Sequence, residues 1–154
     1  MKITEYTPDR AKEVTELFYE AVYQIDPAIY SDQQKSAWAP LPINYEQWSA
    51  RLAIKQPFIL LINNKVAGFI ELEESGYIDC AYVLPKYQKQ GVATALVNYV
   101  LSACEHLNIT SIHVDASIIA KPLFKKFGFV IQQKNEVKRN NVILINYTMV
   151  KFLN

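Results

Sequence analysis

The residues from 88 to 94 have the types and the spacing of a loop that binds phosphate. They follow an apolar stretch, they open a stretch with helical spacing, and they read Gln88, Lys89, Gln90, Gly91, Val92, Ala93 and Thr94. Backbone N–H groups in the first turn of a helix have no partner within the helix, and the helix dipole adds partial positive charge there. Gly91 lets the backbone approach a ligand closely, and Ala93 keeps its position small. We therefore expect a pyrophosphate at this loop, with Gln88 and Lys89 as further donors. A glycine in an ordinary strand–helix turn is the alternative for these residues alone.

The elements that would position this loop form one domain. Apolar runs and period-two patterns predict strands at residues 2–6, 58–62, 66–73, 77–84, 112–116, 129–133 and 142–150. Helical spacing, capping residues and prolines predict helices at residues 8–26, 32–38, 45–55, 91–107 and 121–127. Asparagine pairs at 63–64 and 140–141 predict hairpin turns. This order predicts a single α/β domain over residues 1–154, with helices packed on a mixed sheet.

Two segments carry a resemblance to a known family. The spacing Gln-x-x-Gly-x-Ala from Gln88 resembles motif A, the acetyl-CoA loop of the GNAT superfamily of N-acetyltransferases. The segment 114–129, a strand and a short helix ending in Gly-Phe, resembles motif B of that superfamily. The stretch 30–39, YSDQQKSAWA, is similar to a narrower, YafP-like bacterial subgroup. The resemblance implies the GNAT-type acyl-CoA N-acyltransferase fold, with a central mixed, mostly antiparallel sheet flanked by helices. It also implies an N-acetyltransferase with acetyl-CoA (coenzyme A) as co-substrate.

The resemblance assigns the cofactor contacts residue by residue. In this fold the fourth strand splays from the fifth, and the pantetheine arm lies in the gap. Backbone groups at Ala81, Tyr82 and Val83 should pair with that arm. The N–H groups from Gln88 to Thr94 should hold the pyrophosphate. Ser117 and Phe124 should lie near the pantetheine and the thioester.

The expected reaction is direct attack of a primary amine on the thioester, so a group must take a proton from the amine. Asp79 is the first candidate, because burial in an apolar strand raises the pKa of a carboxylate. Glu71 on the adjacent strand is the second candidate. A structural carboxylate is the alternative role for Asp79. Many GNAT enzymes carry a tyrosine where this chain has Phe124, so Ser117 or water would have to protonate the leaving thiolate. A thiolate can also leave unaided, since a free thiol has a pKa of about 8.5.

Two tryptophans fall in the segment that usually walls the acceptor site of this superfamily. Trp38 could hold an apolar or cationic amine or could pack in the core, whereas we expect Trp48 to pack in the core. We expect His113 to be structural. Asp115 could line the site or cap the following helix.

The composition argues against several classes of function. The 154 residues include 51% hydrophobic and 20% charged residues, with a net charge of +1 and no basic tract, which argues against a nucleic-acid partner. No apolar run is long enough to span a bilayer, and the two cysteines have no metal-site spacing. We expect a cytoplasmic protein with no metal, two reduced thiols and a small-molecule or protein amine as substrate. The resemblance also makes a homodimer one candidate assembly.

Two other functions compete with the N-acetyltransferase. The first is a non-catalytic acyl-CoA-binding or regulatory domain on the same fold, which the loss of the usual tyrosine at Phe124 favours. The second is a toxin that acetylates aminoacyl-tRNA, which the near-neutral charge argues against. The acceptor substrate, the acyl chain and the oligomeric state are left open by the sequence.

Overall fold

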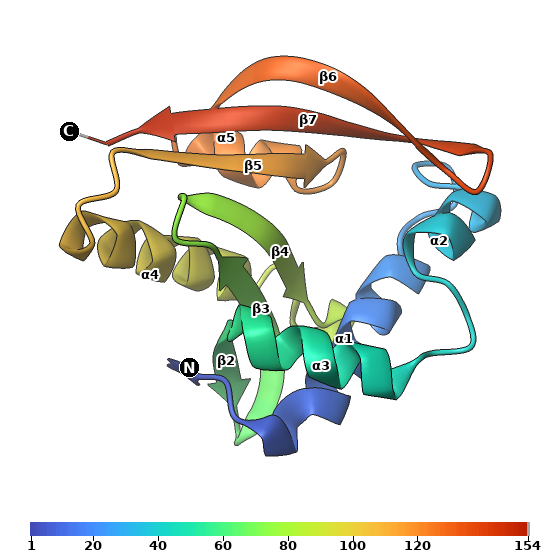
Figure 1. Cartoon of the computed structure of the whole chain (residues 1–154), viewed down its shortest axis with the longest axis horizontal. Coiled ribbons are helices and arrows are strands. Elements are labelled where there is room, and N and C mark those ends of the chain that lie inside the picture. Colours follow the sequence, from blue (N-terminus) through green and yellow to red (C-terminus); the bar gives the residue numbers. More distant parts are fainter. Residues whose placement is uncertain (154) are drawn as a thin grey trace.

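The computed structural model describes residues 1–153, and Figure 1 shows its strands and helices. The strands are β1 (Lys2–Glu5), β2 (Phe58–Ile62), β3 (Lys65–Leu72), β4 (Tyr77–Val83), β5 (Ser111–Ser117), β6 (Val130–Arg139) and β7 (Val142–Phe152). The helices are α1 (Ala11–Tyr23), α2 (Asp32–Trp38), α3 (Tyr45–Lys55), α4 (Val92–His106) and α5 (Lys121–Lys126), with 3₁₀ turns at Pro8–Arg10 and Pro85–Tyr87. Within the described residues, no helix is both long enough and apolar enough to cross a membrane.

All seven strands form one sheet in the order β1-β2-β3-β4-β5-β7-β6. Every neighbouring pair is antiparallel except β4 and β5, which are parallel. The expected α/β fold with a mixed, mostly antiparallel sheet is therefore confirmed. Both expected asparagine turns are present, because Asn63, Asn64, Asn140 and Asn141 all have the positive φ that such hairpins require.

The fourth and fifth strands diverge, as the resemblance implied. They pair only at Tyr77 with His113 and at Ile78 with Val114, near the start of β4. Beyond these pairs the two strands separate, and Figure 1 shows β4 turning away from β5. The sheet is thus open along the carboxyl-terminal halves of both strands.

The two faces of the sheet carry separate apolar cores. On one face, α4 packs on β3 and β4, and Gly68 permits this close approach because a Cβ there would meet Val92 at 2.8 Å. On the other face, α1 and α3 cover Phe69, Cys80 and the neighbouring residues. Cys80 and Cys104 are both buried and unpaired.

Several boundaries differ from those expected. Helix α1 begins at Ala11 rather than at residue 8, because the chain after Thr7 first makes a 3₁₀ turn and the Thr7 side chain forms no cap hydrogen bond. The same helix ends at Tyr23, before the expected end at residue 26. Strand β6 extends to Arg139 rather than ending at residue 133, because its polar second half pairs with β7 up to the hairpin turn.

Candidate active site

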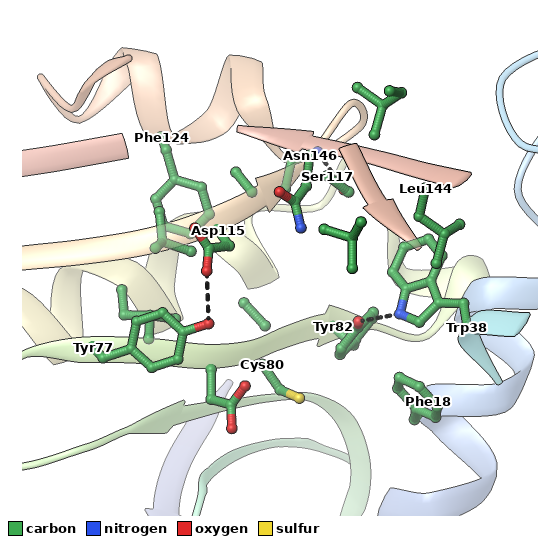
Figure 2. Close-up of a pocket in the computed structure, with 18 of the residues that line it drawn as sticks. Phe18, Trp38, Tyr77, Cys80, Tyr82, Asp115, Ser117, Phe124, Leu144 and Asn146 are labelled. Carbon is green, nitrogen blue, oxygen red and sulfur yellow. Dashed lines mark hydrogen bonds between the residues drawn. The ribbon is translucent and has the colours of Figure 1, made fainter. Parts of the chain in front are cut away.

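A cavity of about 440 Å³ lies where β4 and β5 diverge. Residues of α1, α2 and α3 bound it on one side, and the hairpin of β6 and β7 bounds it on another. Figure 2 shows Tyr77 and Asp115 at one end and Trp38, Tyr82 and Phe18 at the other. Its volume is in the range of small-molecule sites.

Some of the expected site residues line this cavity and others lie elsewhere. The lining includes Trp38, Asp79, Ala81, Tyr82, Ser117 and Phe124. Glu71, Val83 and the loop from Gln88 to Thr94 are not part of the lining. The loop follows β4 at its carboxyl end, where the gap between the strands opens.

Asp79 occupies a β-bulge, which interrupts the regular alternation of side chains along β4. Glu71 pairs with Cys80 and Leu72 pairs with Ile78, so Asp79 is an extra residue in the ladder. Ala81 packs against the core beneath α4, whereas Asp79 reaches α3 on the opposite face. Asp79 and Ala81 therefore lie on opposite faces of the sheet, although they are two residues apart in the strand.

The surroundings of Asp79 are ionic rather than apolar. Its Oδ2 accepts from Arg51 at 3.1 Å and from Lys55 at 2.8 Å, and its side chain is 28% exposed. The structure therefore does not contain the apolar enclosure that we expected around Asp79. Both ion pairs use Oδ2.

Glu71 is the fully buried member of the same cluster. Its Oε2 accepts from Arg51, while its Oε1 has no hydrogen-bond partner within residues 1–153. Glu71, our second candidate for the base, is fully buried and is not part of the cavity lining, so its position does not support contact with a substrate. Arg51, which the sequence analysis missed, lines the cavity instead. The available signal was the i, i+4 spacing of Arg51 and Lys55 on one helix face opposite acidic strand residues.

An aromatic wall closes the other end of the cavity and consists of Phe18, Trp38, Trp48 and Tyr82. The indole N–H of Trp38 donates to the Tyr82 hydroxyl at 3.1 Å. The ring of Trp48 lies 4.6 Å from that of Phe18, and the Arg51 guanidinium lies 5.1 Å from the Trp48 ring centroid. Trp48 packs against the core, as expected, and it also lines the cavity. Burial raises the pKa of Tyr82 well above its usual value, which keeps this phenol protonated.

The YSDQQKSAWA stretch anchors α2 beside this wall. Ser31 and Gln34 form the expected capping box. The Tyr30 hydroxyl donates to the carbonyl of Ile145 at 2.8 Å, which ties the start of the stretch to β7. The buried Lys35 ammonium donates to the carbonyls of Tyr23 and Ile25 at the end of α1. These bonds position Trp38 against the cavity.

Tyr77 and Asp115 face each other across the point where the strands separate. The Tyr77 hydroxyl donates to Asp115 Oδ2 at 3.1 Å, and Thr148 donates to Asp115 Oδ1 at 2.7 Å. Burial, followed by the Asp115 charge, raises the pKa of Tyr77. His113 packs its ring against Tyr77 with centroids 5.0 Å apart, which agrees with a structural role. Of the two roles left open for Asp115, the structure places it in the lining of the site.

Ser117 and Phe124 lie together on the β5–α5 side of the cavity. The Ser117 Oγ accepts from the backbone N–H of Ala120 at 3.1 Å, so its own hydrogen is left to donate. Phe124 is buried and packs against Phe129 with ring centroids 5.1 Å apart. The position that holds tyrosine in many relatives is thus apolar here.

The loop before α4 has the geometry that a pyrophosphate requires. Gly91 caps the helix with a φ of +84°, which only glycine adopts readily. A Cβ at this position would meet no atom of the described residues within 4 Å, so the space beside Gly91 is open. The first N–H groups of α4 have no partner inside the helix. These residues therefore fit the diphosphate of coenzyme A.

The comparisons with known proteins agree with this geometry. Residues 27–151 match the family model described as the acetyltransferase (GNAT) domain. The chain belongs to the GNAT acetyltransferase family.

Three similar proteins illustrate the relationship. The chain is 34% identical over 149 residues to the uncharacterized N-acetyltransferase YafP of Escherichia coli K12, covering 97% of this chain and 94% of YafP. The second is a crystal structure from Rhodopseudomonas palustris, named a GCN5-related N-acetyltransferase and class-II aminotransferase. It is 30% identical with a TM-score of 0.92, and the match covers 99% of this chain and 95% of that one. The third structure is yncA from Salmonella typhimurium, described as a candidate acetyltransferase with its cofactor acetyl-CoA. It has a TM-score of 0.74 at 14% identity, and the match covers 99% of this chain and 94% of yncA. This last likeness concerns the fold alone.

Proposed function

We propose that this chain is an N-acetyltransferase that moves an acetyl group from acetyl-CoA to a primary amine by direct attack. The observation that carries the proposal is the open gap between β4 and β5. This gap leads from the phosphate loop at the carboxyl end of β4 to a cavity with two carboxylates, Asp79 and Asp115. A cofactor arm and an amine can therefore meet inside the sheet.

The chain's own groups would hold the two reactants. Backbone N–H groups from Gln88 to Thr94 would bind the pyrophosphate. Residues Ala81 to Val83 pair with β3 on one side but not with β5 on the other, and their backbone groups on that open side would bind the arm. Acetyl-CoA supplies an activated thioester carbonyl. The nitrogen–carbon bond forms, the carbon–sulfur bond breaks, and the nitrogen loses a proton.

Asp79 and Ser117 are our proposed groups for proton transfer. Asp79 Oδ2 is held by Arg51 and Lys55, so Oδ1 is the oxygen that would take the amine proton directly or through one water. Ser117 keeps a hydroxyl hydrogen to give to the leaving sulfur, because its oxygen accepts from Ala120. If Ser117 has this role, Ser117→Ala lowers turnover, and unchanged turnover would show that water serves instead.

A non-catalytic acyl-CoA-binding domain is the second candidate, and the apolar Phe124 favours it. In that case acetyl-CoA would bind, but no amine would release its thiol. The N-acetyltransferase proposal requires both binding and release.

The first experiment is a calorimetric titration with acetyl-CoA of the wild type, of Gly91→Glu and of Gly128→Glu. Gly128 also has a positive φ, of +87°, but it follows α5 instead of preceding α4. We expect micromolar binding that only Gly91→Glu abolishes. A thiol-release assay with primary amines then tests transfer. A folded wild type that does not bind acetyl-CoA would sink the proposal.

A further inference from the structure

The charge of Asp115 is the least compensated in the cavity. Two carboxylates line the cavity, and Asp79 is paired with two cations. Within residues 1–153, Asp115 instead accepts only from the neutral hydroxyls of Tyr77 and Thr148. Hydroxyl donors orient a carboxylate but leave its negative charge in place. Its side chain is also exposed, so a ligand can reach it.

The network around Asp115 fixes its orientation toward the cavity. Both carboxylate oxygens are held, one from β4 by Tyr77 and one from β7 by Thr148. Thr148 in turn accepts from Asn135 of β6 at 2.8 Å. A carboxylate held directly from two strands loses little conformational freedom when a ligand binds.

The aromatic wall lies at the opposite end of the same cavity. Figure 2 shows Trp38, Tyr82 and Phe18 on the side away from Asp115. Trp48 extends the wall through its contact with Phe18. Flat rings of this kind bind apolar or aromatic groups and add cation–π attraction for a nearby ammonium.

The direction of the cofactor arm indicates at which end of the cavity the thioester would lie. The phosphate loop lies at the carboxyl end of β4, so an arm that starts there runs back toward the junction at Ile78 and Val114. Asp115 directly follows Val114, at this junction. An ammonium on Asp115 would therefore lie next to the thioester, with the rest of the molecule toward the aromatic wall. It would give one proton to Asp79, directly or through one water, before the nitrogen attacks. The second proton would leave the nitrogen as the carbon–sulfur bond breaks, and the departing sulfur would end as the thiol.

We propose that the acceptor is a small primary amine bound as its cation, with the ammonium on Asp115 and an apolar or aromatic body against Phe18, Trp38 and Trp48. This inference rests on the proposed N-acetyltransferase function and adds the class of its substrate. The cavity volume of about 440 Å³ suits a small molecule rather than a protein surface. Arg139 also lines the cavity, but within residues 1–153 it forms no ion pair with Asp115.

The test uses matched ligands and matched variants. The amines are 2-phenylethylamine, ethylamine and a short peptide with a free amino terminus, and 2-phenylethanol serves as the uncharged analogue. The variants are Asp115→Asn, Asp115→Glu, Trp48→Ala and Glu136→Gln. Glu136→Gln removes one negative charge from the exposed face of β6 and is the electrostatic control. Asparagine at 115 can still accept from Tyr77 and Thr148 through its side-chain oxygen.

We expect 2-phenylethylamine to have the highest kcat/KM of the three amines. Asp115→Asn should raise its KM at least tenfold with a smaller change in kcat, Asp115→Glu should restore part of the affinity, and Glu136→Gln should change nothing. Trp48→Ala should raise the KM for 2-phenylethylamine but not for ethylamine. Equal kcat/KM for all three amines, preference for the peptide, or an unchanged KM in Asp115→Asn would overturn the inference.

Calorimetry separates this inference from the proposed function. The ligands are titrated into wild type and Asp115→Asn saturated with coenzyme A, without any turnover. We expect 2-phenylethylamine to bind the wild type at least tenfold more tightly than 2-phenylethanol, and Asp115→Asn to remove the difference. This result would support the acceptor site even when no thiol is released. If the two ligands bind equally, the inference fails even when another amine is acetylated.

Discussion

The guanidinium of Arg51 donates to the carboxylate of Glu71, a residue that is fully buried between the sheet and α3. A buried carboxylate that loses its cation is left with an uncompensated charge, which costs about 3–5 kcal/mol. We therefore predict that Arg51→Ala lowers the free energy of unfolding by several kcal/mol, measured by urea denaturation. The double variant Arg51→Met with Glu71→Gln removes both charges and should recover most of this loss. Equal losses in the single and double variants would contradict this account.

Gly76 and Gly91 have similar backbone conformations in different surroundings, which gives a second prediction. Their φ angles are +92° and +84°, but a Cβ on Gly76 would lie 2.3 Å from the carbonyl oxygen of Ser111, whereas one on Gly91 would meet no atom within 4 Å. Both alanine variants pay the left-handed penalty of about 1–2 kcal/mol. Gly76→Ala must in addition push β4 away from β5, so we expect it to unfold at clearly lower urea concentrations than Gly91→Ala. Equal midpoints would refute the close approach at Gly76.

Lys35 is nearly inaccessible, with 3% of its surface exposed, and its ammonium satisfies the carbonyls of Tyr23 and Ile25. Methionine would fill the same space but leave these acceptors unpaired. Because hydrogen bonds to a charged group contribute about 1.5–3 kcal/mol each, we predict that Lys35→Met is destabilised by at least about 2 kcal/mol in thermal or urea unfolding. Lys12→Met, on the exposed face of α1, should leave stability nearly unchanged. Similar effects of the two substitutions would argue against a capping role for Lys35.

The raised pKa values of Tyr77 and Tyr82 predict a loss of stability in alkali. In the unfolded chain a tyrosine ionises near pH 10, whereas burial keeps these two phenols protonated in the folded protein. Above pH 10 the unfolded state therefore binds fewer protons, so the free energy of unfolding falls as the pH rises, and it is unaffected by these groups at neutral pH. Urea denaturation between pH 8 and pH 11.5 should show this fall, and Tyr77→Phe should make it shallower. An identical slope in Tyr77→Phe would mean that Tyr77 ionises normally.

Features that depend on residues close together in the sequence could be predicted from the sequence alone. The strand, glycine and helix around Gly91, the Ser31–Gln34 capping box and the asparagine turns were all predicted correctly, because each is determined within a few positions. The pairing of Arg51 with Asp79 joins residues 28 positions apart. The spacing of Arg51 and Lys55 indicates a basic helix face but does not specify which acidic residue it meets. The second half of β6 was missed for a related reason, since an exposed, polar edge strand has no apolar alternation to detect.

The bulge at Asp79 has a consequence for how this site changes in evolution. Ile78 and Cys80 already point to opposite faces of the sheet, as adjacent residues in a regular strand do. Deleting Asp79 would therefore leave every other side chain of β4 on its present face. A single-codon deletion or insertion could thus remove or restore this carboxylate without repacking either core. Among relatives of this chain, a gap at this position would mark the loss of one charged group rather than a change of fold.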